Sequence, residues 1–356
     1  MTSESSGWNS ATAFADRAIA RISSLGIPTS GSGIELLSKR TLFTDPLAAR
    51  QVSMGGFCRL IPVADGWCAV HLPREDDLEL LPAWVGIEAQ STEIPWDALE
   101  SVLALRTTDD LVGAAQELGL AVAALPGGDD EQLIDRSTVN VARPWIQRSV
   151  GQRRSDMTLN DAVVVDLSSL WAGPLCSRIL TTAGARVIKV ESSSRPDASR
   201  DGDREFFDWL HDGHEFRTIA FETAAGRSEL VELLEHADIV IEGSRPRALE
   251  RLGIVPSEFV EKRPGTIWVS ITAYGRCGPW RNWVGFGDDA AVAGGLVDVA
   301  ANGKPSFVGD AVADPLTGLL AAALVAGSVA RGGGVTIDLA LREVARSAAH
   351  SARVVW

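Results

Sequence analysis

The segment AVVVDLSSLWAGPLCSRILTTAGARVIKVE, residues 162–191, decides the fold. Its first part, Ala162–Leu167, is an almost continuously apolar run, which is typical of a strand buried on both faces of a parallel sheet. A helix is expected over Leu175–Ala183 and ends at Gly184, because glycine favours the left-handed conformation that closes helices. A second strand then finishes at Glu191. The segment therefore predicts a β-α-β unit.

The same alternation continues downstream. We expect a helix over Ala225–His236, a strand over Ala237–Glu242, a helix in PRALERLG (246–253) and a strand over Thr266–Thr272. Strands that alternate with helices predict an α/β fold with a Rossmann-like open parallel sheet, which binds ligands at the carboxyl ends of its strands.

The part of the chain before this unit has a different pattern. Leu60–Leu72 is expected to form a hairpin that turns at Ala64-Asp65-Gly66, and a helix capped by Thr107 or Thr108 is expected to end at Gly119. We therefore divide the chain into an N-terminal arm (1–45), a small α/β domain (46–130), a linker (131–158) and a large Rossmann-like domain (159–356).

Composition limits the possible partners. The chain has 356 residues and a net charge of −14, so neither nucleic acid nor an anionic membrane is expected to bind it. The longest apolar run, Leu316–Ala330, is shorter than a membrane span and is expected to be a buried core helix. The start of the chain does not resemble a signal peptide, and the four scattered cysteines favour a reduced, cytoplasmic protein.

Asp314 is the first candidate for chemistry. It precedes Pro315 and a long alanine- and leucine-rich run, and both residue types are favoured at helix starts. We expect Asp314 at the N-terminus of the buried helix, where the helix dipole favours its ionised form. Two roles remain open at this point: a helix cap, or a carboxylate nucleophile at the mouth of a pocket.

Other chemistries have weaker support. His211 and His214 in HDGHE lack an identifiable third ligand, so no metal site is predicted. Glu191 lies where dinucleotide folds bind a ribose hydroxyl, but the preceding turn, WAGP, lacks the glycine fingerprint, which disfavours a nicotinamide cofactor. Carboxylates beside glycine-rich turns remain as candidates: Asp288, Asp289, Asp310 and Asp314.

Several segments in order resemble the class III CoA-transferases of the CaiB/BaiF type. The first is the 162–191 unit with its AGP turn and VIKVE strand. The others are ADIVIEGSRPRALERLGI (237–254), TIWVSITAYGRCGPW (266–280), GFGDDAAVAGGLV (285–297), ADPLTGLLAAALVAG (313–327) and RGGGVTIDLAL (331–341). These segments match the family's blocks over some 175 residues.

The resemblance implies CoA transfer between an acyl-CoA and a carboxylic acid, with CoA as a substrate and no tightly bound cofactor. Asp314 matches the family's catalytic aspartate, which forms a covalent intermediate with the acyl-CoA. A homodimer, possibly interlocked, is also implied. The implied CoA-binding residues are Trp171, Ala172, Gly173, Glu191, Arg245, Arg251 and Tyr274, and Arg247 also lies where it could meet CoA phosphates. The implied acyl-site residues are Gly55, Gly56, Gly294 and Gly295.

The chain also departs from the family pattern, which keeps alternatives open. The histidine of the racemase branch is absent at Gly285-Phe286, which favours a transferase over an acyl-CoA racemase or isomerase. Gly243-Ser244 replaces the family's Asn-Phe, so a catalytically inactive, CoA-binding partner subunit is a further alternative. The small domain resembles one that the family places after the aspartate, so the order of segments is expected to be circularly permuted.

Overall fold

The computed structural model describes residues 6–29, 31–41, 50–88, 93–127, 140–351 and 354–355. Its centre is a seven-stranded sheet in the order β4-β12-β9-β8-β5-β6-β7. Neighbouring strands are parallel except β4 and β12, which are antiparallel. The strands are β4 (Trp145–Ser149), β5 (Val163–Leu167), β6 (Arg186–Ser192), β7 (Glu215–Ile219), β8 (Ile239–Glu242), β9 (Ile267–Thr272) and β12 (Val335–Ala340). The predicted Rossmann-like α/β sheet is confirmed.

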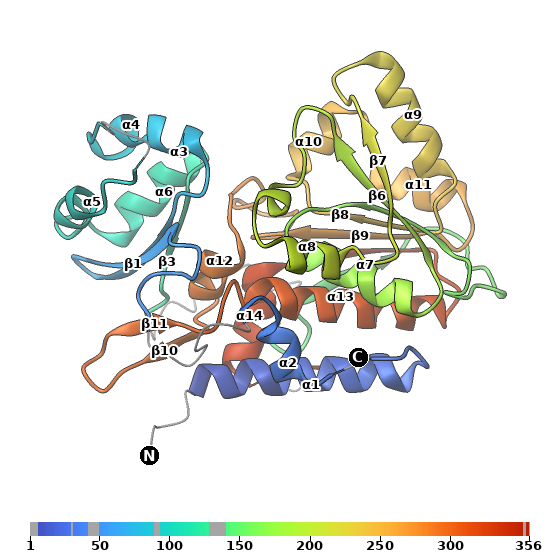
Figure 1. Ribbon diagram of the computed structural model, residues 1–356, viewed down its shortest axis with the longest axis horizontal. Helices are drawn as coiled ribbons and strands as arrows, with labels where there is room; N and C mark the ends of the chain where they lie inside the picture. The colour runs from blue at the N-terminus through green and yellow to red at the C-terminus, as the bar shows by residue number, and fades with distance from the viewer. Residues whose placement is uncertain are drawn as a thin grey trace.

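Helices cover both faces of this sheet (Figure 1). One face carries α7 (Ala172–Thr182) and α13 (Ala313–Val329), and α8 (Arg204–Leu210) lies beside α7. The other carries α9 (Ala224–Glu235), α10 (Pro246–Arg251) and α11 (Pro256–Lys262). Neighbouring residues of one strand enter opposite layers: Val164 packs in the core with α7 and α13, and Val165 packs in the core with α9 to α11. This two-sided burial explains the apolar strands.

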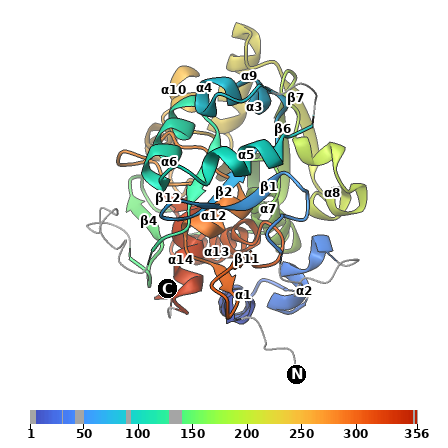
Figure 2. The ribbon, with the colours of Figure 1, turned by 90° about the vertical axis from the view of Figure 1, so that its left-hand side faces the viewer.

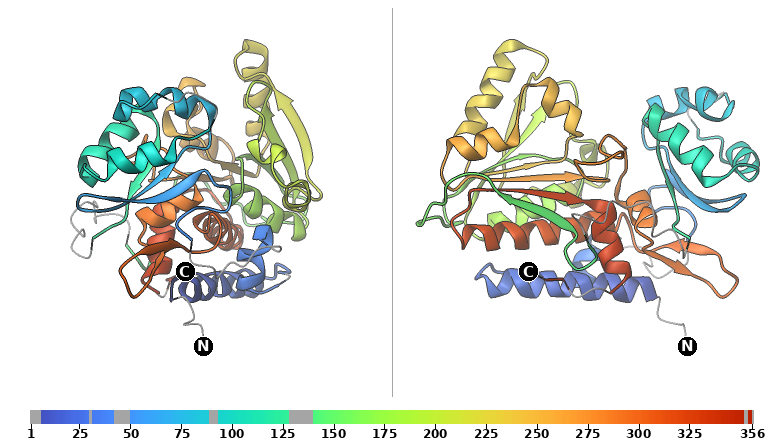
Figure 3. Two further views of the ribbon diagram at one scale, coloured as in Figure 1. Left: turned by 60° about the vertical axis from the view of Figure 1, so that its left-hand side comes forward. Right: turned by 180° about the vertical axis from the view of Figure 1, so that it is seen from behind.

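Helix α13 forms the middle of the larger core, and each of its residues is buried. Helix α1 (Ser6–Ser24) lies along α13 and buries Phe14, Ala18 and Ile22 (Figures 1 and 3). The short helix α2 (Gly33–Leu37) and the C-terminal helix α14 (Leu341–Ala349) pack beside them. In the described part of the chain, no helix is long and apolar enough to cross a membrane.

A smaller α/β unit lies at one end of the large sheet and faces the viewer in Figure 2. Its antiparallel sheet contains β1 (Cys58–Val63), β2 (Gly66–His71) and β3 (Ala121–Ala124). Its helices are α3 (Glu75–Glu79), α4 (Leu81–Val85), α5 (Trp96–Leu103) and α6 (Thr108–Leu118). They enclose one core against the sheet, and the opposite sheet face packs on α12 (Gly287–Ala293) of the large unit. A hairpin of β10 (Val297–Val299) and β11 (Pro305–Phe307) follows α12.

Two strands differ from the sequence prediction. The predicted linker contains β4, which joins the large sheet as an antiparallel edge strand against β12. Its exposed positions are polar because an edge strand has one partner, so the segment resembles a linker. The polar segment after His214 contains the other edge strand, β7, four of whose five residues are exposed. The division into an arm, a small domain, a linker and a large domain stays a prediction, and some of its positions lie outside the described residues.

Candidate active site

Asp314 lies in the first turn of α13, with 8% of its surface exposed. The helix begins at Ala313, and its N-cap is Val312, which has no side-chain capping bond. The predicted capping position is therefore wrong, because the helix begins two residues before Pro315 and includes Asp314. Burial first, and then the charge of Asp288, raise the pKa of Asp314 to about 7, although the charge of Arg40 opposes the rise. The expected dipole stabilisation does not offset this burial.

Four buried carboxylates share this region, and we call Asp288, Asp289, Asp310 and Asp314 the aspartate cluster. Asp288 accepts a hydrogen bond of 2.8 Å from the backbone N–H of Ala311, which fixes the loop that leads into α13. Asp310 lies 2.8 Å from the Nε of Arg40, which reaches the cluster from the N-terminal segment. Burial also raises the pKa of Asp310 to about 7. The cluster therefore carries more acid than its cations balance.

Gly287 is the glycine that contacts the nucleophile candidate. A methyl group at this position would clash with the carbonyl oxygen of Ala311 and lie 2.7 Å from Oδ2 of Asp314. Only a residue without a side chain lets the start of α12 approach α13 this closely. Gly287 belongs to the GFGDD motif. The sequence indicates the aspartates of this motif as candidate carboxylates, but it does not indicate Gly287 as a site residue.

The small unit contributes His71, from the end of β2, to the same place. Its Nδ1 lies 2.9 Å from Oδ1 of Asp289, and its ring packs on Phe286 at 4.9 Å between centroids. Burial lowers the pKa of His71, but the bond and charge of Asp289, together with Asp288, outweigh it and raise the pKa overall. Asp289 also accepts a hydrogen bond of 2.9 Å from the N–H of Phe286. A histidine thus lies beside the turn where the motif itself lacks one.

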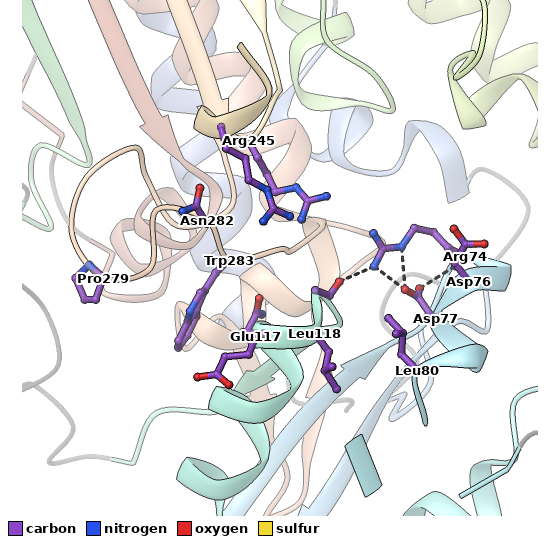
Figure 4. Close-up of a pocket in the computed structure, with 13 residues that line it drawn as sticks. Arg74, Asp76, Asp77, Leu80, Glu117, Leu118, Arg245, Pro279, Asn282 and Trp283 are labelled. Atoms are coloured by element: carbon purple, nitrogen blue, oxygen red, sulfur yellow. Dashed lines mark hydrogen bonds and ion pairs between the residues drawn. The ribbon is translucent and has the colours of Figure 1, made fainter. Parts of the chain in front are cut away.

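An open cleft of about 420 Å³ lies between the two units (Figure 4). The small unit supplies Arg74 and the end of α6, and the large unit supplies Arg245, Arg247 and Trp283. Arg74 is held by Asp77 through a 2.9 Å hydrogen bond from its Nε and by the carbonyl of Gly119 at 2.7 Å. Burial lowers the pKa of Arg245, and the neighbouring charges of Arg247 and Arg74 lower it further. Asp76, Asp77 and Glu117 also line the cleft, and Asp77 pairs with Arg74, so Arg245 and Arg247 are the cations that favour an anionic ligand.

The cleft and the aspartate cluster are joined by a short stretch of chain. Trp283 lines the cleft, and Gly287 contacts Asp314. Four residues of extended chain span at most about 14 Å, so the two places are close. Gln116 of α6 fixes this stretch by bonding the N–H of Val284 at 2.7 Å and its carbonyl at 2.9 Å.

Three of the predicted CoA-binding residues lie at the start of α7. Trp171 is 1% exposed and packs edge-on against Phe206, with Arg40 over its ring. Ala172 and Gly173 are buried in the first turn of α7, and a methyl group at Gly173 would clash with Ser168. As the chain lies here, these side chains serve the packing of α7.

Glu191 belongs to a different, fully paired group. It accepts hydrogen bonds from Arg200 at 2.7 Å and from the N–H of Asp197 at 3.0 Å. Asp197 in turn lies 3.0 Å from the Nζ of Lys189, and both side chains are completely buried. Burial alone would raise the two carboxyl pKa values, but the partners outweigh it and lower both. We call Lys189, Glu191, Asp197 and Arg200 the paired network.

The other predicted residues are spread more widely. Tyr274 is half-buried beside Trp280 and Trp283, and the burial of its hydroxyl, followed by the charge of Asp289, raises its pKa. Arg251 is exposed at the end of α10. Gly55 and Gly56 form an exposed turn before β1, whereas Gly294 packs against the backbone of α14, and Gly295 takes a positive φ of 76°. Contacts with Asp314 come instead from Gly287.

The two histidines for which no metal site is predicted, His211 and His214, lie together in one group of aromatic side chains. His211 is buried beside Phe207, and the ring of His214 packs edge-on against the ring of His211. Burial lowers the pKa of His214 to about 4. Among the described residues, no group of three or more His, Cys, Asp or Glu side chains could hold a metal ion.

The fold and site define an α/β protein with a buried aspartate at a helix start and a basic cleft beside it. The model of CoA-transferase family III matches residues 159–352, which is more than half of the chain. The chain therefore belongs to CoA-transferase family III, and the predicted resemblance is confirmed. The small unit lies outside the matched residues.

The matches to named relatives cover only part of this chain and part of each relative. An acyl-CoA transferase of Fusarium pseudograminearum is 31% identical over 57% of this chain and 49% of its own. Succinyl-CoA–D-citramalate CoA-transferase of Chloroflexus aurantiacus is 31% identical over 50% and 47%. A CaiB/BaiF family protein from Brucella suis, known by its crystal structure, has a TM-score of 0.48 at 29% identity over 54% and 55%. The chain spans about half the length of the curated relatives it matches.

Proposed function

We propose that this protein transfers CoA between an acyl-CoA thioester and a carboxylic acid, with Asp314 as the nucleophile. The observation that carries the proposal is the burial of Asp314 in the first turn of α13, within the aspartate cluster, in the family's matched region. A pKa near 7 leaves enough carboxylate at neutral pH while keeping the group reactive.

The proposed reaction begins when a carboxylate oxygen of Asp314 attacks the thioester carbonyl carbon. The C–S bond breaks, the thiolate of CoA leaves with the bonding electrons, and an acyl-aspartyl anhydride remains. Attack of the thiolate on the aspartyl carbonyl releases the donor acid and leaves an aspartyl-CoA thioester. The acceptor carboxylate then repeats these two steps in reverse, which regenerates Asp314.

The basic cleft supports the CoA part of the proposal. The guanidinium groups of Arg245 and Arg247 match the phosphates of CoA, and Arg74, which pairs with Asp77, lies beside them in the cleft. The stretch from Trp283 to Gly287 brings the cleft close to Asp314, so a flexible arm from the phosphates would reach the nucleophile. Both units contribute to the cleft, so CoA would bind across them. Two of the relatives are named as an acyl-CoA transferase and a succinyl-CoA–D-citramalate CoA-transferase, and the homodimer implied by resemblance stays a prediction.

The test is adduct formation followed by mass spectrometry. The protein is incubated with succinyl-CoA and other acyl-CoA donors, and the covalent adduct is located by peptide mapping and by its loss with hydroxylamine. We expect an adduct on Asp314 in the wild type and in Asp310→Asn, a matched carboxylate control, and none in Asp314→Asn. Full transfer activity in Asp314→Ala would show that Asp314 is not the nucleophile.

Calorimetry with CoA, and with NAD as a control, tests the cleft. Arg245→Gln is expected to weaken CoA binding about tenfold.

A second candidate function is isomerisation at the α-carbon of an acyl-CoA. It is favoured by one observation: His71, hydrogen-bonded to Asp289, adds a buried acid–base group beside the aspartate cluster. Its signature is deuterium incorporation at the α-carbon from D₂O without CoA transfer, abolished in His71→Gln. Transfer without such exchange excludes it.

A further inference from the structure

A second basic pocket lies on the opposite end of α13 from Asp314. Its volume is about 390 Å³, and it lies between the ends of α1 and α13 and the edge strand β4. Four arginines line it: Arg21, Arg143, Arg153 and Arg331. Gly327 on its floor follows Asp314 by 13 residues of the same helix, or about 20 Å along the axis. The pocket is therefore separate from the proposed active site.

Two of the guanidinium groups converge on the floor. A methyl group at Gly327 would lie 3.3 Å from Nη1 of Arg331 and 3.9 Å from Nη2 of Arg21. Two like charges thus share the space above one glycine, where a larger side chain would fill the pocket. Burial lowers the pKa of Arg331, and the charges of Arg21 and Arg153 lower it further.

The positive charge of this pocket is not balanced by carboxylates. Within the described residues, none of the four arginines forms an ion pair, and no acidic side chain lines the pocket. By contrast, Arg148 of β4, the strand that lines the pocket, pairs with Asp338 at 2.7 Å. Helix C-termini offset part of the charge of Arg21 and Arg331, which lie at the ends of α1 and α13. Arg143 and Arg153 come from outside the helices and lack this compensation.

We propose that this pocket binds a small anion of at least two negative charges, of the phosphorylated or polycarboxylic class. Guanidinium groups bind such oxyanions in bidentate fashion, and four of them exceed what one carboxylate needs. Gln147 and Ser149 lie on the pocket side of β4, since alternate residues of a strand share a face, and they add neutral hydrogen-bonding groups. The pocket is a binding site distinct from the basic cleft between the units.

Calorimetry at low ionic strength tests the proposal, with pyrophosphate and citrate as probes. The double variant Arg153→Gln/Arg331→Gln is expected to weaken the better probe at least tenfold, because two charge-assisted contacts are lost. The matched control is Arg148→Gln, which removes an arginine of β4 that does not line the pocket. This variant is expected to bind the probes as the wild type does. Preference for pyrophosphate or for citrate decides between the two ligand classes.

Two results would overturn the proposal: no binding of either probe to the wild type, or equal binding by the double variant. If the double variant fails to fold by circular dichroism, the single change Arg331→Gln replaces it, since this residue is exposed. Arg245→Gln is expected to weaken CoA and leave the probe unchanged. Failure of CoA binding and failure of this pocket are therefore seen separately.

Discussion

The aspartate cluster and the paired network both contain buried carboxylates, but their charges are balanced differently. In the paired network, Lys189 and Arg200 face Asp197 and Glu191, and the pKa values of both carboxyls are lowered. In the aspartate cluster, four carboxylates face Arg40 and His71, and burial raises the pKa values of Asp288, Asp310 and Asp314. Similar burial has therefore produced opposite shifts.

The difference shows what each group is suited to do. A carboxylate whose charge is fully matched is held in place and is a poor candidate for chemistry. A carboxyl group whose pKa is raised by burial and by neighbouring carboxylates is unfavourable in its ionised form. Binding or reaction that removes this charge is therefore favoured. The comparison thus assigns a scaffolding role to the paired network and a reactive one to the aspartate cluster, and the following variants test that assignment.

Lys189→Met should have the largest effect on stability. It leaves Asp197 buried without its cation, so we expect the free energy of unfolding to fall by about 3–5 kcal/mol. Urea denaturation measures the change. Lys262→Met is the control, because its exposed pair with Glu235 is worth less than about 1 kcal/mol. Equal effects of the two changes would contradict a scaffolding role for the paired network.

Gly287→Ala should impair catalysis more than stability. The new methyl group displaces Asp314 by its contact with Oδ2, and a misplacement of about 1 Å costs roughly 100-fold in rate. Steady-state transfer kinetics measure it. Gly55→Ala is the control, since the nearest atom to a methyl group there is 3.5 Å away, on Phe57. A larger loss in Gly55→Ala would move the acyl site to the turn before β1.

Asp314→Asn should stabilise the protein at neutral and alkaline pH. The folded pKa of about 7 exceeds the ordinary 3.8, so wild-type stability falls as pH rises from about 4 to 7, where only the unfolded state readily loses the proton. The amide avoids this loss. We expect a gain of up to a few kcal/mol, at most about 4, at pH 8, and this gain shrinks toward pH 4. A variant less stable than wild type at pH 8 would place Asp314 with the paired carboxylates.

His71→Gln should have the smallest effect, about 1 kcal/mol, because glutamine retains a neutral hydrogen bond to Asp289. The raised pKa of His71 means that its charge stabilises the fold fully below pH 6.5 and that this contribution is lost as pH rises through the folded pKa. Thermal melts at pH 6 and pH 9 measure the difference. A larger deficit at pH 9 than at pH 6 would show that His71 does not act as a counter-charge.

Much of the fold could be predicted because it depends on local patterns. The apolar runs of β5, β6, β8 and β9 alternate with helical segments, and Pro315 lies in the first turn of α13. The two edge strands were missed for a common reason. β4 and β7 have one neighbour each and carry polar residues, so neither has the buried pattern of a central strand.

The candidate site was only partly predictable. Asp314 has a local signal, since an aspartate next to a proline and a long apolar run stands out in the sequence. Arg40 and His71 have none, because they reach the cluster from segments more than 200 residues away. Arg74 likewise meets Arg245 only when the small unit folds against the large one. Such contacts arise from tertiary packing and leave no periodic pattern.

The position of α1 along α13 has a consequence for evolution and engineering. Arg40 follows α1 and α2 in the chain and lies 2.8 Å from Asp310. A slip of α1 by one residue would move it about 1.5 Å along its axis, enough to lengthen this ion pair beyond hydrogen-bond range. Insertions and deletions between residues 6 and 40 are therefore expected to be rarer than substitutions. The reason is that the position of α1 on α13 determines whether Arg40 reaches the buried carboxylate of Asp310.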